Sequence, residues 1–237
     1  MVQEVSRWDQ VPADPYHYPH DHSLSPETTA LVIIDMQRDF CEVGGYFDCQ
    51  GYDVADARAI IPAIHALLST ARKGSFPVFF TREGHRPDLS TLSSRERFRS
   101  RNNPRHLGIG DKGPLGRFLI RGEIGHDVVP ELTPLPEEII IDKPGRGAFA
   151  HTDFEHILRL RGIRNLVLTG VTTDVCVSTT MREANDRGFD CVVLEDATAA
   201  ATPKLHQFAL DSVKMEGGIF GAVTQSGKII EAMKTWA

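Results

Sequence analysis

Three polar side chains stand directly after apolar runs of the sequence, and their types suit acyl-transfer chemistry. Asp35 follows ALVII, Lys143 follows IIID, and Cys176 lies just past NLVLTG. A thiolate attacks carbonyl carbon, a carboxylate can accept the thiol proton, and an ammonium group stabilises neighbouring anions. These three residues therefore predict a site for nucleophilic catalysis by cysteine, provided that the fold brings them together.

The residues around Cys176 predict where its thiol is placed. NLVLTG (165–170) is typical of a buried strand, and CVSTTMREANDRG is typical of a helix that ends at Gly188. A cysteine at such a junction lies near the backbone amides and the positive dipole end of the helix, which favour the thiolate. We therefore expect the pKa of Cys176 to be lowered.

The remaining apolar pattern predicts the elements that position these groups. Short apolar runs typical of buried strands cover 29–35, 76–81, 137–142, 165–170, 191–196 and 218–224. Helical spacing covers 54–73, 152–161, 176–187, 203–215 and 226–236. This alternation predicts an α/β fold, a three-layer αβα sandwich with a doubly wound, six-stranded, mainly parallel sheet. Ligands bind beyond the carboxyl ends of such strands, so the three side chains are expected to converge there.

Two segments fall outside this alternation. Residues 1–27 are rich in Pro, His and Tyr, and we expect an extended N-terminal arm, compatible with wrapping around a neighbouring subunit. Its HYPHDHS stretch (17–23) offers either adventitious metal ligands or a polar tail. The rest, 28–237, is expected to be a single domain. Its long loop at about 84–136, with room for short helices, is expected to cover the site, because loops of this length are usually functional or partly disordered.

The overall composition excludes several classes of protein. The 237 residues carry a net charge of −6, which disfavours nucleic acid as a partner. No apolar run is long enough for a membrane span, and the first 25 residues lack a signal-peptide core. The four cysteines form no CxxC pair. We therefore expect free thiols in a soluble, cytoplasmic protein.

Each candidate residue also has a purely structural interpretation. Asp35 could cap a helix, Lys143 could be a solvated loop residue, and Cys176 could be a small apolar filler. A nucleotide-binding domain on a similar sheet is disfavoured because no glycine-rich phosphate loop follows a predicted strand. A non-enzymatic scaffold with a vestigial cysteine is disfavoured by the complete Asp, Lys and Cys set.

Three longer motifs make the chemistry more specific. DMQRDF (35–40), KPGRGAF (143–149) and GVTTDVCVSTTMREANDRGFDCVVLEDA (170–197) resemble the isochorismatase-like cysteine hydrolases, over about residues 28–224. Within that superfamily, the motifs most resemble the biuret and triuret hydrolases. They resemble ureidoacrylate and N-carbamoylsarcosine amidohydrolases less closely.

The resemblance implies roles for particular residues. Asp35, Lys143 and Cys176 would form the catalytic triad, and the backbone N–H groups of Thr172 and Cys176 would form an oxyanion hole. The peptide bond between Val171 and Thr172 would be cis. The resemblance also implies a homotetramer. No metal or cofactor is expected, since we find no equivalent of the Asp-x-His metal site of nicotinamidases.

The implied activity is cleavage of a C–N bond in a small linear ureide through a thioester. Biuret, giving allophanate and ammonia, or triuret is the expected substrate; the alternative is ureidoacrylate, N-carbamoylsarcosine or another small carboxamide. Phe40 and Phe149 are candidates for pocket walls, with core packing as the alternative. Arg82 follows the second strand and could contact substrate or solvent, and the Thr173 hydroxyl could lie near the nucleophile or shape the turn.

Glu216 departs from the resemblance, which leads us to expect glutamine at this position. An ionised carboxylate only accepts hydrogen bonds, whereas an amide also donates them. Glu216 beside the substrate would therefore suit a terminal NH2 group and repel a carboxylate. The alternative is an ion pair with Lys214 or an arginine on the surface.

Overall fold

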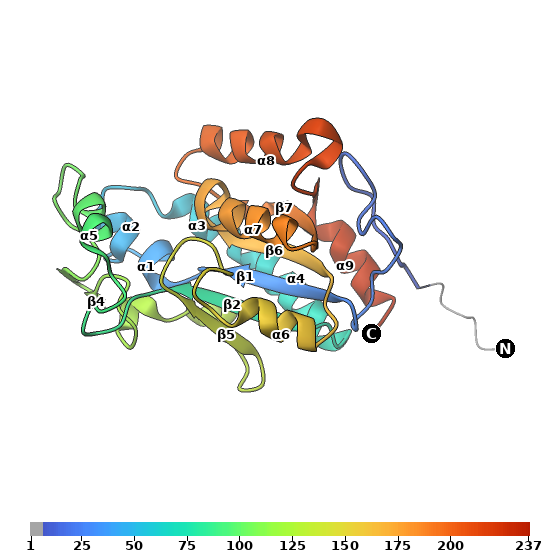
Figure 1. Cartoon of the computed structure of the whole chain (residues 1–237), viewed down its shortest axis with the longest axis horizontal. Helices are drawn as coiled ribbons and strands as arrows, with labels where there is room; N and C mark the ends of the chain where they lie inside the picture. Colours follow the sequence, from blue (N-terminus) through green and yellow to red (C-terminus); the bar gives the residue numbers. More distant parts are fainter. Residues whose placement is uncertain (1–6) are drawn as a thin grey trace.

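The fold is a three-layer αβα sandwich, which confirms the predicted class (Figure 1). The computed structural model describes residues 7–237. Its main sheet has the order β5-β2-β1-β6-β7-β8, and each strand pairs in parallel with its neighbour. The strands are β1 (Thr29–Ile34), β2 (Val78–Glu83), β5 (Ile139–Lys143), β6 (Asn165–Val171), β7 (Asp190–Ala199) and β8 (Ala222–Thr224).

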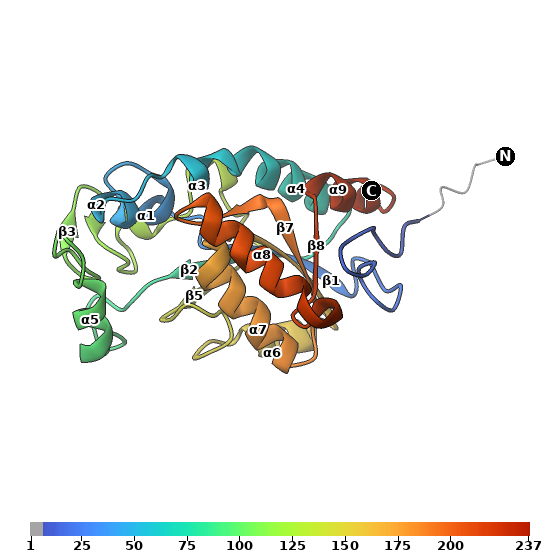
Figure 2. The ribbon, with the colours of Figure 1, turned by 90° about the horizontal axis from the view of Figure 1, so that it is seen from above.

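Helices cover both faces of this sheet (Figure 2). One face carries α3 (Ala55–Ala59), α4 (Ile61–Lys73) and α9 (Ser226–Lys234); the other carries α6 (Phe154–Leu160), α7 (Ser178–Asp186) and α8 (Pro203–Gly218). Strand β1 supplies both cores by alternation: Leu31 and Ile33 belong to one, and Val32 and Ile34 to the other. The helix predicted at 54–73 is divided at Ile60, where α4 begins with a proline in its first turn.

The end of β6 needs a glycine to approach β1. A Cβ on Gly170, whose φ is +104°, would lie 2.0 Å from the carbonyl oxygen of Ile34. A residue with a side chain would push the two strands apart at this point. Beyond this contact the chain enters a π-helical turn, η3 (Thr173–Val177), which carries Cys176.

The segment predicted as a covering loop has structure of its own. Residues 84–136, the covering segment, include α5 (Ser94–Ser100), the short hairpin of β3 (Lys112–Gly113) and β4 (Gly116–Arg117), η1 (Ile124–His126) and η2 (Pro130–Leu132). It lies at the same end of the molecule as α1 (Arg38–Cys41) and α2 (Tyr46–Cys49) (Figure 1). The Asp39 carboxylate links them, since it accepts the N–H groups of Leu119 at 2.8 Å and Tyr46 at 3.1 Å.

The described part of the N-terminal arm lies at the opposite end of the molecule (Figure 1), and it contacts β8, which Figure 2 labels. Asp14 forms an antiparallel bridge with Val223, and the Tyr16 hydroxyl donates to Asp190 at 2.7 Å. Residues 7–27 therefore pack on their own chain, and contact with a neighbouring subunit stays a prediction. Within residues 7–237, the helices are too short or too polar to traverse a bilayer.

Candidate active site

The carboxyl ends of β1 and β5 bring a carboxylate and an ammonium group into contact inside the protein. Lys143 Nζ lies 2.7 Å from Asp35 Oδ2, and both side chains are fully buried. Lys143 also donates to the carbonyl of Gly145 at 2.9 Å. Burial alone would lower the pKa of Lys143, but Asp35, Cys176 and Glu83 outweigh it and raise that pKa. The ammonium charge is therefore retained inside the site.

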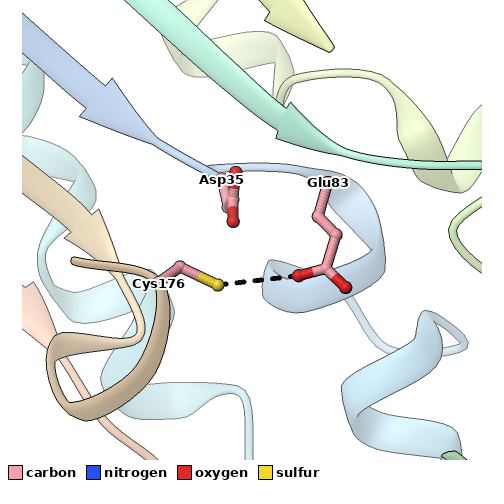
Figure 3. Close-up of side chains that lie close together, drawn as sticks. All are labelled: Asp35, Glu83 and Cys176. Atoms are coloured by element: carbon pink, nitrogen blue, oxygen red, sulfur yellow. Dashed lines mark hydrogen bonds between the residues drawn. The ribbon is translucent and has the colours of Figure 1, made fainter. Parts of the chain in front are cut away.

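The thiol of Cys176 lies beside the carboxylates of Asp35 and Glu83 (Figure 3). Its Sγ lies 3.6 Å from Glu83 Oε2, to which it donates. The sulfur and the nearest carboxyl oxygens of Asp35 and Glu83 all lie within 4.8 Å of one another. The structure thus brings together the three residues that the sequence places after strands, with the sulfur within reach of a proton acceptor.

Strand β2 fixes the Asp35 carboxylate. The Thr81 hydroxyl donates to Asp35 Oδ1 at 2.6 Å, and the Asp35 N–H donates to the Thr81 carbonyl at 3.1 Å. Asp35 has a φ of +50°, a conformation that aspartate tolerates better than most residues. One carboxylate oxygen is therefore held by a hydroxyl and the other by Lys143.

The direction of the thiol pKa differs from our expectation. Cys176 lies inside the π-helical turn, before α7 begins at Ser178, and its side chain is buried. Burial raises the pKa of the Cys176 thiol well above its usual value; Lys143 opposes this, while Asp35 and Glu83 add to it. In the resting site the thiol is protonated, so attack requires a proton acceptor at the time substrate binds.

Glu83 was missed by the sequence analysis. The predicted strand ended at residue 81, whereas β2 continues to Glu83. Because side chains alternate along a strand, Glu83 points to the same side as Thr81, which already contacts Asp35. Burial raises the pKa of Glu83, and Lys143 and Arg146 oppose this shift. Extending the strand by two residues would have placed this second carboxyl at the site.

The donor atoms of Asp35, Glu83 and Cys176 are close enough to suggest a metal site. However, the Lys143 ammonium lies 2.7 Å from Asp35 and 3.8 Å from Glu83. A divalent cation beside these carboxylates would be repelled by this lysine at close range. The residues present therefore suit an ammonium group and do not fit a metal ion.

A cavity of about 350 Å³ opens onto Cys176, within the size range of small-molecule sites. Aromatic groups form much of its wall, and Phe40 is among them as predicted. The cavity is lined by Phe40, Tyr46, Phe47, Gln50, Tyr52, Glu83, Arg146, Thr172, Asp174, Val175, Cys176, Ala201 and Leu205. The sequence analysis named Phe40, Thr172 and Cys176 from this set, and Val171–Thr172 is a cis peptide, as the resemblance implied.

Arg82 and Phe149, predicted to contact the substrate, do not reach the cavity because of the elements on which they lie. Arg82 precedes Glu83 on β2, so its side chain leaves the opposite side of the strand and pairs with Asp142 at 2.8 Å. Phe149 is packed in the core, with its ring centroid 5.0 Å from that of Phe154. Neither residue lines the cavity, and for Phe149 the core-packing alternative describes its surroundings.

The other two predicted contacts, Thr173 and Glu216, do not line the cavity either. The Thr173 hydroxyl lies 2.8 Å from His206 Nδ1 and is buried. Glu216 is exposed at the kink near the end of α8, whereas Leu205 at the beginning of that helix lines the cavity. Within one chain, Glu216 therefore does not line the cavity, and its contact with a terminal NH2 group stays a prediction.

Comparison with known proteins agrees with this geometry. The isochorismatase domain model matches residues 29–226. The chain belongs to the isochorismatase family. It is 36% identical over 193 residues to the ureidoacrylate amidohydrolase RutB of Pantoea ananatis, covering 81% of this chain and 77% of that protein. The corresponding protein of Pseudomonas syringae is 34% identical over 192 residues, covering 81% and 78% of the two chains.

Solved structures show the same fold. A cysteine hydrolase from Pseudomonas syringae pv. phaseolicola superposes with a TM-score of 0.76 at 25% identity, covering 90% of this chain and 96% of that one. N-carbamoylsarcosine amidase from Thermoplasma acidophilum gives a TM-score of 0.63 at 25% identity, covering 84% and 96%. This isochorismatase-family chain is therefore a cysteine hydrolase of the amidohydrolase type. The motifs pointed first to biuret hydrolases, whereas these curated relatives are named for ureidoacrylate.

Proposed function

We propose that this protein hydrolyses the terminal C–N bond of a small, uncharged linear ureide, with biuret as the first substrate to test. The charge of the cavity carries this proposal. Glu83 and Asp174 line it beside Arg146, and Arg146 is already paired with Glu96 at 2.6 Å. An anionic substrate would enter beside these carboxylates, whereas an uncharged ureide offers them N–H donors.

The first half of the reaction uses Asp35 as the base. Asp35 accepts the Cys176 proton, and the sulfur attacks a ureide carbonyl carbon, placing negative charge on its oxygen. The backbone N–H groups of Thr172 and Cys176 donate to that oxygen, and one such donor is typically worth about 2.7–4 kcal/mol. Asp35 then returns the proton to the leaving nitrogen. The C–N bond breaks, ammonia is released, and the acyl group remains on Cys176 as a thioester.

The second half regenerates the thiol. Asp35, again ionised, accepts a proton from a water molecule that attacks the thioester carbonyl. The C–S bond breaks, the sulfur recovers a proton, and the acid is released; for biuret this product is allophanate. Lys143 Nζ lies 2.7 Å from Asp35 Oδ2 and holds this carboxyl group in position through both halves.

Ureidoacrylate is the second candidate substrate, and the names of the curated relatives favour it more directly than biuret. It carries the same terminal ureido group but ends in a carboxylate. The two candidates thus share the attacked bond and differ in charge at the distal end.

An ammonia-release assay over biuret, triuret, ureidoacrylate and N-carbamoylsarcosine separates these candidates. We expect kcat/KM for biuret or triuret to exceed that for ureidoacrylate by about tenfold or more, equivalent to about 1.4 kcal/mol. A preference for ureidoacrylate would transfer the assignment to the second candidate. No release from any ureide would refute both.

A further inference from the structure

Arg146 is the one cationic side chain among the described residues that line the cavity. Its Nη2 donates to Glu96 Oε1 at 2.6 Å, and its Nη1 lies 3.9 Å from Glu83 Oε1. The Arg146 side chain is 36% exposed and that of Glu96 only 13%, so this pair is more sheltered than an ordinary surface pair. The guanidinium charge is therefore balanced before any substrate enters.

The covering segment supplies this balancing carboxylate. Glu96 lies in the first turn of α5, and its N–H donates to the Ser93 hydroxyl at the helix N-cap, at 3.1 Å. Acidic residues are favoured in that first turn, so the cap and the helix dipole hold Glu96 in place. A segment that otherwise closes one end of the molecule thus sets the charge of the pocket.

Arg146 is also tied to the catalytic lysine through its own loop. The loop follows β5, and Lys143 Nζ donates to the carbonyl of Gly145, the neighbour of Arg146, at 2.9 Å. The guanidinium is therefore held by Glu96 on α5, and the backbone next to Arg146 is held by Lys143, which also contacts Asp35. Arg146 and the nucleophile Cys176 line the same cavity.

We propose that the Glu96–Arg146 pair selects substrates by charge. The remaining N–H donors of Arg146 bind the distal carbonyl oxygen of an uncharged ureide. Glu96 makes the guanidinium a poor partner for a substrate carboxylate. That carboxylate would have to compete with Glu96 for the guanidinium, and the negative charge of Glu96 would repel it. This inference rests on the proposed function and names the residues that determine its specificity.

The decisive variant is Glu96→Gln, which removes the charge and keeps the size and one acceptor. We expect the ratio of kcat/KM for ureidoacrylate to that for biuret to rise about tenfold, through KM for the carboxylate substrate. Combining Glu96→Gln with Arg146→Gln is expected to abolish that rise, because the cation that would bind the carboxylate is gone.

Glu131→Gln is the matched control. Glu131 pairs with Arg58 at 2.6 Å, both side chains are more than two-fifths exposed, and neither lines the cavity. Its substitution is expected to leave the substrate ratio unchanged.

Three results would overturn the inference. The first is a Glu96→Gln enzyme that still hydrolyses ureides with the wild-type ratio. The second is an equal loss for both substrates together with a lowered unfolding temperature, which would show that the pair acts only on structure. The third is wild-type enzyme that hydrolyses no ureide, and this result alone also refutes the proposed function.

Discussion

The floor and the rim of the pocket are built differently. The floor lies on strand ends and on the turn after β6, and its side chains are nearly or fully buried. It consists of Asp35, Glu83, Lys143 and Cys176. The rim, represented by Tyr46, Gln50 and Arg146, belongs to a short helix and loops, and Arg146 takes its position from the covering segment. Reactivity therefore depends on the sheet, whereas the proposed substrate choice depends on segments added to its edge.

The largest expected difference between buried and exposed charges concerns Lys143. Lys143→Met leaves Asp35 and Glu83 without their buried cation, and breaking a buried pair in this way typically costs about 3–5 kcal/mol. We expect ureide turnover to be lost together with that much free energy of unfolding, measured in urea.

Arg58→Met provides the exposed counterpart. The Arg58–Glu131 pair is 2.6 Å long but lies in solvent, so its loss is expected to cost less than about 1 kcal/mol. Equal losses of stability for the two variants would contradict the distinction between floor and surface.

The covering segment has a pH dependence of its own. Burial lowers the pKa of His126 to about 4, from 6.5 in the unfolded chain, with Arg82 and Arg121 adding to the shift and Asp142 and Asp127 opposing it. Between these values the unfolded chain binds more protons, so the stability from this group is full above pH 6.5 and is lost as the pH falls toward 4.

The expected loss for His126 is about 3 kcal/mol by pH 4, from a difference of about 2.5 pKa units at about 1.4 kcal/mol per unit. Urea unfolding measured at intervals from pH 7 to about pH 4 would show it, and His126→Gln should flatten this dependence. A profile of unchanged slope in the variant would assign the acid sensitivity to other groups.

Two phenylalanines distinguish the rim from the core. Phe40 lines the cavity, whereas Phe149 packs against Phe154 and Phe189. Phe149→Leu is expected to lower the free energy of unfolding by about 1–2 kcal/mol with KM unchanged. Phe40→Leu is expected to raise KM severalfold; the reverse pattern of KM effects would return Phe149 to the substrate site.

The smallest expected effect is on the labelling rate of the Cys176 thiol, which distinguishes the influence of Glu83 from that of Lys143. Glu83 raises the pKa of Cys176 and Lys143 lowers it. Glu83→Gln should therefore increase the thiolate fraction at a given pH, and the rate of iodoacetamide labelling of Cys176 should rise severalfold near neutral pH. Lys143→Met should shift labelling in the opposite direction, so shifts of the same sign would show that the charges do not act as described.

The sheet, and the meeting of Asp35, Lys143 and Cys176 at its edge, could be predicted from the sequence because both depend on short-range patterns. Apolar runs marked the strands, and a parallel sheet obliges Asp35 and Lys143 to share an edge. The cis bond at Val171–Thr172 came only with the family resemblance. The thiol pKa was predicted in the wrong direction, because helix polarity was weighed without the burial that outweighs it.

The rim could not be predicted in the same way. The charge of Arg146 is balanced by Glu96, which is 50 residues away on a helix with little apolar periodicity. Arg82 and Glu83 are adjacent, and choosing between them required knowing where β2 ends. Long-range pairing and strand register, which local patterns do not specify, decide these positions. The homotetramer also stays a prediction.

The most direct test is ammonia release by Cys176→Ala with the best ureide of the panel. Removing the nucleophile is expected to reduce kcat by about a thousandfold or more while the circular dichroism spectrum stays native. Undiminished release from a folded Cys176→Ala enzyme would contradict covalent catalysis at the pocket floor.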